Sequence, residues 1–256
     1  MSITIRGLTL GAGRPKIIVP ILAQTVEESA RQAAQLIHNP AAELIELRLD
    51  GLADPSAEAM ADALREVRQI LGVRADSKPL LVTLRTKAEG GMLALDFDAY
   101  AARLDALLAA GGADLIDIEY SAGAGVRAAL RTAAQAAGVF TVFSHHEFTA
   151  TPPAAEMTNL LCAMGADGAD IAKLAVMPAA PADVAALLLA TAQAKAKMPG
   201  RPLITMSMGA AGAVSRVCGG AFGSAATFGA VTLASAPGQP GAAELHAALD
   251  ALQKCL

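Results

Sequence analysis

This chain of 256 residues has few cysteines, few aromatic residues and no net positive charge. The three cysteines, Cys162, Cys218 and Cys255, are too few and too scattered for a disulfide framework or a zinc ribbon. The formal net charge of -4, with lysine and arginine dispersed, does not suit a protein that binds a nucleic-acid backbone. We therefore expect a protein of a reducing compartment with no nucleic-acid partner.

Long hydrophobic runs are also missing, although 54% of the residues are hydrophobic. Much of this content is alanine interrupted by charge, so no run reaches the roughly 20 residues that span a bilayer. The first six residues lack the apolar core of a signal peptide, and no Pro/Ser-rich or charge-rich linker divides the chain. These absences predict a cytoplasmic protein without a membrane partner, folded as a single catalytic domain over residues 1–256.

The sequence does contain a regular alternation of short apolar runs and amphipathic stretches. The apolar runs predict eight strands, at residues 17–22, 44–49, 80–84, 115–118, 140–143, 171–176, 203–206 and 225–228. Apolar residues at three- and four-residue steps predict helices at 26–37, 57–71, 97–110, 126–137, 154–164, 182–194 and 242–252. Eight strand-and-helix units favour an α/β fold of the closed (β/α)8 TIM-barrel type. An open doubly wound sheet is the alternative, but Pro20-Ile21-Leu22 brings no glycine-rich phosphate fingerprint.

Two short alternating segments precede the first predicted barrel strand. Ile3-Thr4-Ile5 and Leu8-Thr9-Leu10 are spaced as the two arms of a hairpin. We expect residues 1–14 to form an N-terminal β-hairpin that covers the amino-terminal end of the barrel.

Unusual polar residues stand at the carboxyl ends of the predicted strands or in the loops that follow them. They are Glu46 and Arg48 at the second strand, Arg85 after the third, Asp117 and Glu119 at the fourth, His145 and His146 after the fifth, Lys173 in the sixth, Arg216 in the loop after the seventh and Gln239 after the eighth. Stability alone does not require charges there, because an apolar lining stabilises a barrel as well or better. Their placement predicts an active site at this end of the barrel.

Lys173 is the most informative of these residues, because it interrupts the apolar run 171–176. Many strand lysines point to solvent, but a buried one either finds a carboxylate partner or loses its proton and becomes a nucleophile. A nucleophilic amine near a histidine, which exchanges protons at neutral pH, predicts imine chemistry on a carbonyl substrate.

The other polar residues leave alternatives open. Arg48, Arg85 and Arg216 suit bidentate binding of a carboxylate or phosphate, or else they pair with nearby acidic side chains. We expect no metal, because adjacent residues of an extended chain, such as His145 and His146, point to opposite sides. The segment Gly219-Gly220-Ala221-Phe222-Gly223-Ser224 suits either a phosphate site or a tight loop. Cys218 next to it lacks a nearby histidine that would activate its thiol.

Taken together, these segments resemble type I 3-dehydroquinate dehydratase (3-dehydroquinase) over nearly the whole chain. The segments that carry the resemblance are 46–50 (ELRLD), 82–85 (VTLR) with 89–91 (EGG), 144–148 (SHHEF) with 151–152 (TP), 169–173 (ADIAK), 204–209 (ITMSMG), 215–216 (SR), 222–228 (FGSAATF) and 234–239 (ASAPGQ). Two positions depart from the family pattern: Gly51, where a bulkier residue is expected, and the spelling Cys218-Gly219-Gly220.

The resemblance implies a homodimeric lyase of the shikimate pathway, in aromatic amino acid biosynthesis, that uses neither metal nor cofactor. It removes water from 3-dehydroquinate by syn elimination and gives 3-dehydroshikimate. Lys173 resembles the lysine that forms the Schiff base, His146 the general base and acid, and Glu89 the carboxylate that orients this histidine. The positions that resemble substrate-binding residues are Arg216, the main partner of the substrate carboxylate, and Glu46, Arg48, Arg85, Ser235 and Gln239.

Two rival functions fit some of the same residues. A class I aldolase is also a barrel with a Schiff-base lysine, and it would cleave carbon–carbon bonds of phosphorylated aldols. A non-catalytic carboxylate-binding or sensor protein on a degenerate barrel would have lost Lys173 or His146, and this chain retains both.

Overall fold

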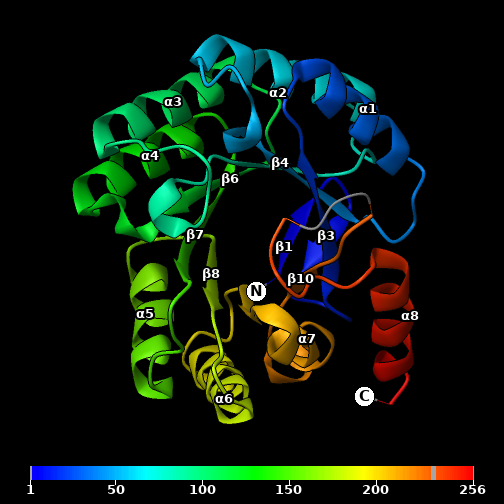
Figure 1. Cartoon of the computed structure of the whole chain (residues 1–256), viewed down its shortest axis with the longest axis vertical. Helices are drawn as coiled ribbons and strands as arrows, with labels where there is room; N and C mark the ends of the chain where they lie inside the picture. Colours follow the sequence, from blue (N-terminus) through cyan, green and yellow to red (C-terminus); the bar gives the residue numbers. More distant parts are fainter. Residues whose placement is uncertain (1, 232–234, 256) are drawn as a thin grey trace.

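The computed structural model describes residues 2–231 and 235–255. In this part of the chain, eight parallel strands form a central sheet and eight α-helices surround it (Figure 1). The strand order is β10-β3-β4-β5-β6-β7-β8-β9, and a parallel bridge between Leu203 and Ser224 joins the two ends. The predicted (β/α)8 barrel is therefore confirmed.

The strands and helices lie close to their predicted positions. The barrel strands are β3 (Lys16–Leu22), β4 (Leu44–Arg48), β5 (Leu80–Thr83), β6 (Leu115–Glu119), β7 (Phe140–Glu147), β8 (Ile171–Val176), β9 (Leu203–Ser207) and β10 (Ala226–Phe228). The helices are α1 (Val26–Leu36), α2 (Ala57–Leu71), α3 (Phe97–Ala110), α4 (Ala124–Ala136), α5 (Ala154–Ala166), α6 (Pro181–Lys197), α7 (Gly209–Cys218) and α8 (Ala242–Gln253). Short 3₁₀ turns are η1 (Leu49–Gly51), η2 (Lys87–Glu89), η3 (Tyr120–Ala122) and η4 (Gly219–Phe222).

One predicted strand boundary and one predicted loop were wrong. Strand β7 does not end at Phe143, because its pairing with β8 continues from Val142 to Glu147, so His145 and His146 lie within the strand. Helix α7 was not predicted, and it places Arg216 in the last turn of a helix instead of in a loop. Its small residues permit close packing: a Cβ at Gly212 would lie 2.4 Å from the carbonyl atoms of Ser207.

Alternation along the strands divides the barrel interior into an apolar and a polar part. Toward the amino ends of the strands, the inward-facing residues of the buried apolar cluster include Ile18, Leu44, Leu81, Leu115, Val142, Ile171, Ile204 and Ala226, which form the lower apolar layer. Two residues further along several strands, the inward positions are polar: Glu46, Asp117 and Lys173 are examples. The outward-facing strand residues pack against the helices in a second apolar cluster, as Ile45 and Val82 do. The lower layer thus supports a charged floor at the carboxyl ends of the strands.

The predicted N-terminal hairpin is present, formed by β1 (Ile3–Ile5) and β2 (Leu8–Leu10) in antiparallel pairing. Ile5 and Leu10 are buried in the same cluster as the lower apolar layer. Arg6, between the two strands, donates a hydrogen bond to Asp114 at 2.7 Å and so ties the hairpin to the barrel. Figure 1 shows β1 near the middle of the ring of strands, and the bond from Arg6 to Asp114, which directly precedes β6, places the hairpin at the amino-terminal end.

Within residues 2–231 and 235–255, none of the helices combines the length and the hydropathy that crossing a bilayer requires.

Candidate active site

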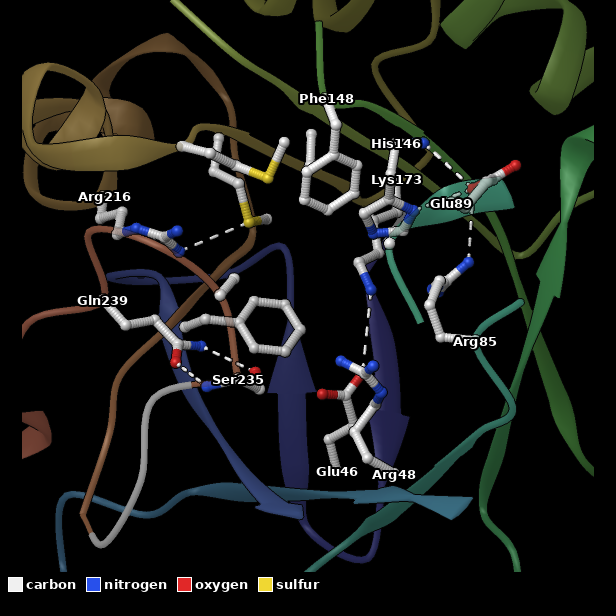
Figure 2. Close-up of a pocket in the computed structure, with 16 residues that line it drawn as sticks. Glu46, Arg48, Arg85, Glu89, His146, Phe148, Lys173, Arg216, Ser235 and Gln239 are labelled. Atoms are coloured by element: carbon white, nitrogen blue, oxygen red, sulfur yellow. Dashed lines mark hydrogen bonds and ion pairs between the residues drawn. The ribbon is translucent and has the colours of Figure 1, made fainter. Parts of the chain in front are cut away.

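A single cavity at the carboxyl ends of the strands collects all nine site residues predicted from the sequence (Figure 2). They are Glu46, Arg48, Arg85, Glu89, His146, Lys173, Arg216, Ser235 and Gln239. The remaining lining residues are mostly apolar: Gly90, Phe148, Ala175, Met206, Met208, Phe228 and Ala236. The cavity therefore offers polar groups on an otherwise apolar wall, as enclosed small-molecule sites commonly do.

Lys173 lies at the floor of the cavity and is only 3% exposed. Its Nζ is 3.2 Å from Asp117 Oδ2, to which it donates a hydrogen bond, and 3.8 Å from Glu46 Oε1. The same Nζ lies 4.9 Å from the centre of the Phe228 ring. The solvent-facing alternative for this lysine is excluded, and its side chain lines the cavity.

His146 and Glu89 form a hydrogen-bonded pair beside Lys173. The Glu89 Oε2 atom is 3.0 Å from His146 Nδ1 and accepts a bond from the His146 backbone N–H at 3.1 Å. Burial by itself would raise the pKa of Glu89, but hydrogen bonds from His145 and His146 and the charge of Arg85 hold it well below its usual range. An ionised carboxylate only accepts hydrogen bonds, so Nδ1 carries the imidazole proton and Nε2 keeps a free lone pair.

His146 is held in its neutral form. Burial, and then the nearby charge of Arg85, lower its pKa to about 3. Its ring stacks against Phe148, with centroids 6.5 Å apart and planes inclined by 23°. Figure 2 shows the imidazole and the Lys173 side chain on the same side of the cavity, and the charge of Lys173 contributes to the lowered pKa of His146, so a neutral base lies near the amine.

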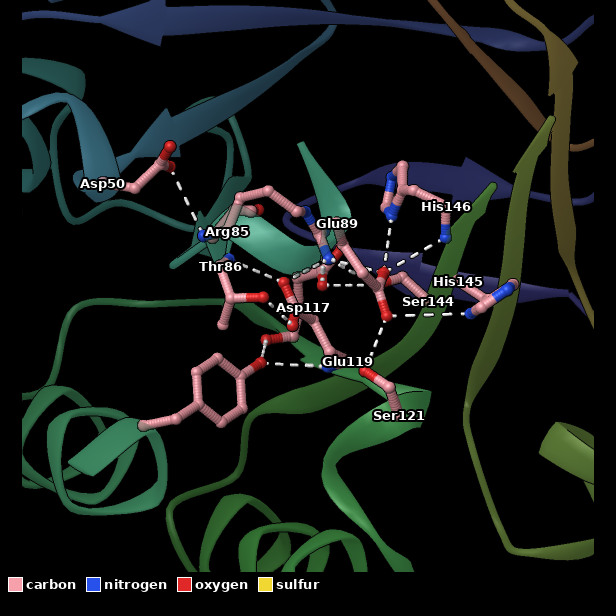
Figure 3. Close-up of polar contacts among 12 residues, drawn as sticks. Asp50, Arg85, Thr86, Glu89, Asp117, Glu119, Ser121, Ser144, His145 and His146 are labelled. Atoms are coloured by element: carbon pink, nitrogen blue, oxygen red, sulfur yellow. Dashed lines mark hydrogen bonds and ion pairs between the residues drawn. The ribbon is translucent and has the colours of Figure 1, made fainter. Parts of the chain in front are cut away.

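Arg85 connects the lysine and histidine sides of the site through a network of buried carboxylates (Figure 3). Its guanidinium lies 2.7 Å from Asp117 Oδ1, 3.0 Å from Glu119 Oε1 and 3.4 Å from Glu89 Oε2. Burial would lower the pKa of Arg85, but these three carboxylates raise it above its usual value. Arg85 is thus fully ionised and fixed by partners within the protein.

Arg216, on the opposite wall, has no comparable partners. It is 1% exposed, and its guanidinium donates to Met206 Sδ at 3.5 Å and to the Pro237 carbonyl at 3.3 Å. Its Nε has no hydrogen-bond partner, and none of the ion pairs among the described residues includes it. Burial lowers the pKa of Arg216 to about 10, still well above neutral pH. A buried cation without a counter-charge is costly, so this wall is suited to receive an anion.

The other predicted binding residues are placed around these groups. Gln239 accepts a bond from the Ser235 backbone N–H at 2.7 Å and donates to Ser235 Oγ at 3.2 Å, which fixes both side chains at the rim. Arg48 donates two bonds to Asp50, at 2.8 and 2.9 Å, so it has the acidic partner that the sequence had left open.

Several residues of the site were not assigned a function from the sequence. Asp117 was noticed only as a polar residue at a strand end, although the alternation in Leu115-Ile116-Asp117-Ile118-Glu119 aims it at the same interior as Lys173. Phe148 and Phe228 had no polar signal, and only knowledge of which strand face points inward could have identified them.

The alternative sites find little support. Among the described residues, no group of three or more histidine, cysteine, aspartate or glutamate side chains could hold a metal ion. Burial raises the pKa of the Cys218 thiol, which opposes its activation. The glycine-rich segment forms η4 and a tight turn with Gly223 at a φ of +107°.

The structure also explains the unusual Gly51. A Cβ at this position would lie 2.7 Å from Leu22 Cδ1 and 3.0 Å from the Ala23 carbonyl oxygen. Leu22, at the end of β3, and the following Ala23 pack directly on this glycine, so a bulkier residue there would have to displace them.

Comparisons with known proteins agree on one family. The model of the family described as type I 3-dehydroquinase matches residues 17–255. The 3-dehydroquinate dehydratase of Neisseria gonorrhoeae is 42% identical over 98% of this chain and 97% of its own length. That of Salmonella agona is 39% identical over 99% of both.

Solved structures give the same result. A type I 3-dehydroquinate dehydratase from Clostridium difficile, solved with covalently modified comenic acid, is 35% identical with a TM-score of 0.92, covering 100% of this chain and 99% of that one. A 3-dehydroquinate dehydratase from Geobacillus kaustophilus is 33% identical with a TM-score of 0.93, covering 99% and 97%. The resemblance found in the sequence is thereby confirmed: the chain belongs to the type I 3-dehydroquinase family.

Proposed function

We propose that this protein is a lyase that dehydrates 3-dehydroquinate to 3-dehydroshikimate through a Schiff base on Lys173. The observation that carries the proposal is the cavity itself, which holds a buried amine and a neutral histidine opposite a buried arginine without a counter-charge. A substrate with a ketone at one end and a carboxylate at the other fits this arrangement. The names of the relatives point to the same substrate.

The substrate is held by charge and by hydrogen bonds. Its carboxylate lies against Arg216, with Ser235 and Gln239 at the same rim, and this places the C3 ketone toward Lys173. Arg48 and Glu46 serve the ring hydroxyls, since both line the cavity floor near the amine. Arg85 contributes mainly through its charge, because its guanidinium is already engaged by carboxylates.

Imine formation is the first chemical step. The Lys173 ammonium passes a proton to a neighbouring base, and the neutral amine attacks C3 and forms a C–N bond. The resulting carbinolamine loses the former ketone oxygen as water, so that ammonium and ketone become iminium and water with no net change in protons. The iminium draws electrons from C2 and makes the C2 proton acidic.

Elimination and release follow. His146 Nε2 takes the C2 proton and leaves an enamine, while Glu89 stabilises the imidazolium that forms. The enamine electrons expel the C1 hydroxyl, which receives the proton from His146 and leaves as water. Hydrolysis of the new iminium then frees 3-dehydroshikimate and restores the Lys173 ammonium.

The reaction needs no metal and no cofactor, because the lysine and the histidine supply every bond-making and proton-transfer step. We further propose that the enzyme is a homodimer, is cytoplasmic and acts in the shikimate pathway. Size-exclusion chromatography with light scattering tests the dimer directly.

Turnover tests the function. The enzyme should convert 3-dehydroquinate into the conjugated enone of 3-dehydroshikimate, which is followed by its ultraviolet absorbance. Lys173→Ala should lose turnover, and His146→Ala should form some imine but turn it over poorly. Activity on phosphorylated aldols with none on 3-dehydroquinate would favour the aldolase alternative, and binding without turnover would favour a sensor.

A further inference from the structure

Asp117 occupies a special place in the site, because it lies behind the cavity wall yet touches the reacting nitrogen. It is completely buried, and its Oδ2 faces Lys173 Nζ at 3.2 Å. Its other oxygen, Oδ1, accepts bonds from Arg85 at 2.7 Å and from Ser144 Oγ at 2.6 Å. Arg85 and Ser144 thus orient the carboxylate through Oδ1, and Oδ2 is left to accept the bond from the Lys173 amine.

We propose that Asp117 is a positioning residue that acts as the fixed counter-ion of Lys173, first for the ammonium and then for the iminium of the Schiff base. This inference rests on the proposed function of the site. The positive charge on nitrogen survives the conversion of ammonium to iminium, so one carboxylate serves both states without moving. It also holds Nζ at a fixed point on the cavity floor, toward which the ketone must be presented.

Two neighbouring carboxylates do not fit this role as well. Glu46 is 3.8 Å from Nζ, beyond hydrogen-bond distance, and it lines the cavity where a substrate hydroxyl would reach it. Glu119, two residues along β6, bonds Arg85 and Thr86 and does not contact Lys173.

The protonation of Asp117 agrees with a lasting negative charge. Burial would raise the pKa of Asp117, but Arg85 and then Lys173 lower it to about 2. Arg85 also bonds Glu89, which holds His146 (Figure 3). Because Asp117 contacts Lys173, the lysine and the base share one charged framework. A change at Asp117 should therefore affect Lys173, which it contacts directly, more than His146, which it reaches only through Arg85 and Glu89.

The test compares Asp117→Asn with Glu119→Gln. Both remove one buried negative charge next to Arg85 and keep the shape of the side chain, but only the first removes the counter-ion of Lys173. The rate of adduct formation on Lys173 is measured by quenching with borohydride in the presence of 3-dehydroquinate, together with kcat, KM and Tm.

For Asp117→Asn we expect the adduct rate and kcat to fall about 100-fold, the scale for loss of one preorganised electrostatic contact. KM should change by less than about threefold, because Arg216 still binds the carboxylate. Glu119→Gln should lower Tm about as much as Asp117→Asn does. It should reduce the adduct rate by less than about tenfold, because the lost charge does not contact Lys173 Nζ.

Equal adduct rates in the wild type and Asp117→Asn would overturn the inference, as would equal losses in the two variants. Should Asp117→Asn fail to fold, Ser144→Ala keeps the carboxylate and removes one bond that orients it. That variant should slow the adduct about threefold to tenfold, because Arg85 still orients the carboxylate after this one bond is lost, and an unchanged rate would contradict the proposal. Absence of the adduct in the wild type would instead reject the proposed function itself.

Discussion

The two adjacent histidines have opposite protonation behaviour, although both contact Glu89. Burial lowers the pKa of His146 to about 3, whereas the hydrogen bond to Glu89 raises the pKa of His145. Below pH 6.5 the unfolded chain protonates His146 while the folded chain does not, so this residue makes stability fall as the pH drops. His145 contributes stability that is complete below pH 6.5 and is lost as the pH rises through its raised value.

Substitution of each histidine should therefore change the pH dependence of stability in opposite directions. Between pH 7 and pH 5, His146→Gln should weaken the acid-induced loss of unfolding free energy by about 1 to 2 kcal/mol, and His145→Gln should strengthen that loss. Urea unfolding at the two pH values measures both. This window lies above the lowered pKa values of Glu89 and Asp117, so their own titration does not interfere. Changes of the same sign in both variants would contradict the assignment.

We expect Arg216 to lower the stability of the protein while it strengthens substrate binding. Its buried guanidinium has few partners, so Arg216→Met should raise KM for 3-dehydroquinate about 100-fold, the scale of one lost charge-assisted contact, and increase the free energy of unfolding by about 1 kcal/mol. Steady-state kinetics and urea unfolding check the two effects.

Arg127 is the matched control for Arg216. It is also buried, but it is paired with Asp167 at 2.8 Å and lies over the Tyr120 ring, away from the cavity. Arg127→Met should lose stability and leave KM unchanged. An Arg216 variant with an ordinary KM would mean that the substrate carboxylate binds elsewhere.

At this scale the sequence predicted which residues meet in the cavity but not how they pair. All nine predicted residues line it, because polar residues at strand ends converge in a barrel. The pairing of Lys173 with Asp117 depends on the register between β6, β7 and β8, which no local pattern contains.

Among the elements, the segment Glu89-Gly90-Gly91 has the strictest spatial requirement. A Cβ at Gly91 would lie 2.0 Å from the Arg85 carbonyl oxygen, and one at Gly90 would lie 2.2 Å from the Phe148 ring. Gly90 also has a φ of +83°, in the left-handed region. These glycines let η2 fold back so that Glu89 reaches His146.

We expect Gly91→Ala to displace η2, to lower the free energy of unfolding by about 1 to 3 kcal/mol through overpacking against backbone, and to reduce kcat more than KM. Gly125→Ala, in α4, is the control, because an added Cβ there meets nothing within 4 Å. The control should stabilise the protein by about 0.5 kcal/mol, since alanine is the better helix former. A Gly91→Ala enzyme with full stability and activity would contradict this account of the turn.

Helix α7 is the one α-helix of the described residues that the sequence did not predict. Its residues, GAAGAVSRVC, include two glycines and few large apolar side chains, so no helical periodicity was visible. The helix forms because it packs closely on the end of β9, which is a tertiary effect. The strands were predictable because each one contains a short apolar run, typical of a buried parallel sheet, even where polar residues follow that run, as they do in β7.

In the whole molecule, substitutions at the hairpin end of the barrel should change stability without changing catalysis at the cavity end. Leu10 of the hairpin is buried against the lower apolar layer, at the end opposite the cavity. Leu10→Ala should cost about 3 kcal/mol of stability and leave kcat and KM within about twofold. Thr4→Ala, an exposed position on the same hairpin, should cost less than about 0.5 kcal/mol. A large loss of kcat in folded Leu10→Ala would show that the two ends are coupled.

The single catalytic domain over residues 1–256 stays a prediction at this scale, as do the dimer and the cytoplasmic location. The proposed reaction depends on the imine at Lys173, which intact-mass spectrometry after borohydride reduction with 3-dehydroquinate, followed by peptide mapping, would detect. We expect one ligand-sized adduct located on Lys173. No adduct, or an adduct at another residue, with intact substrate and active borohydride, would contradict this proposal.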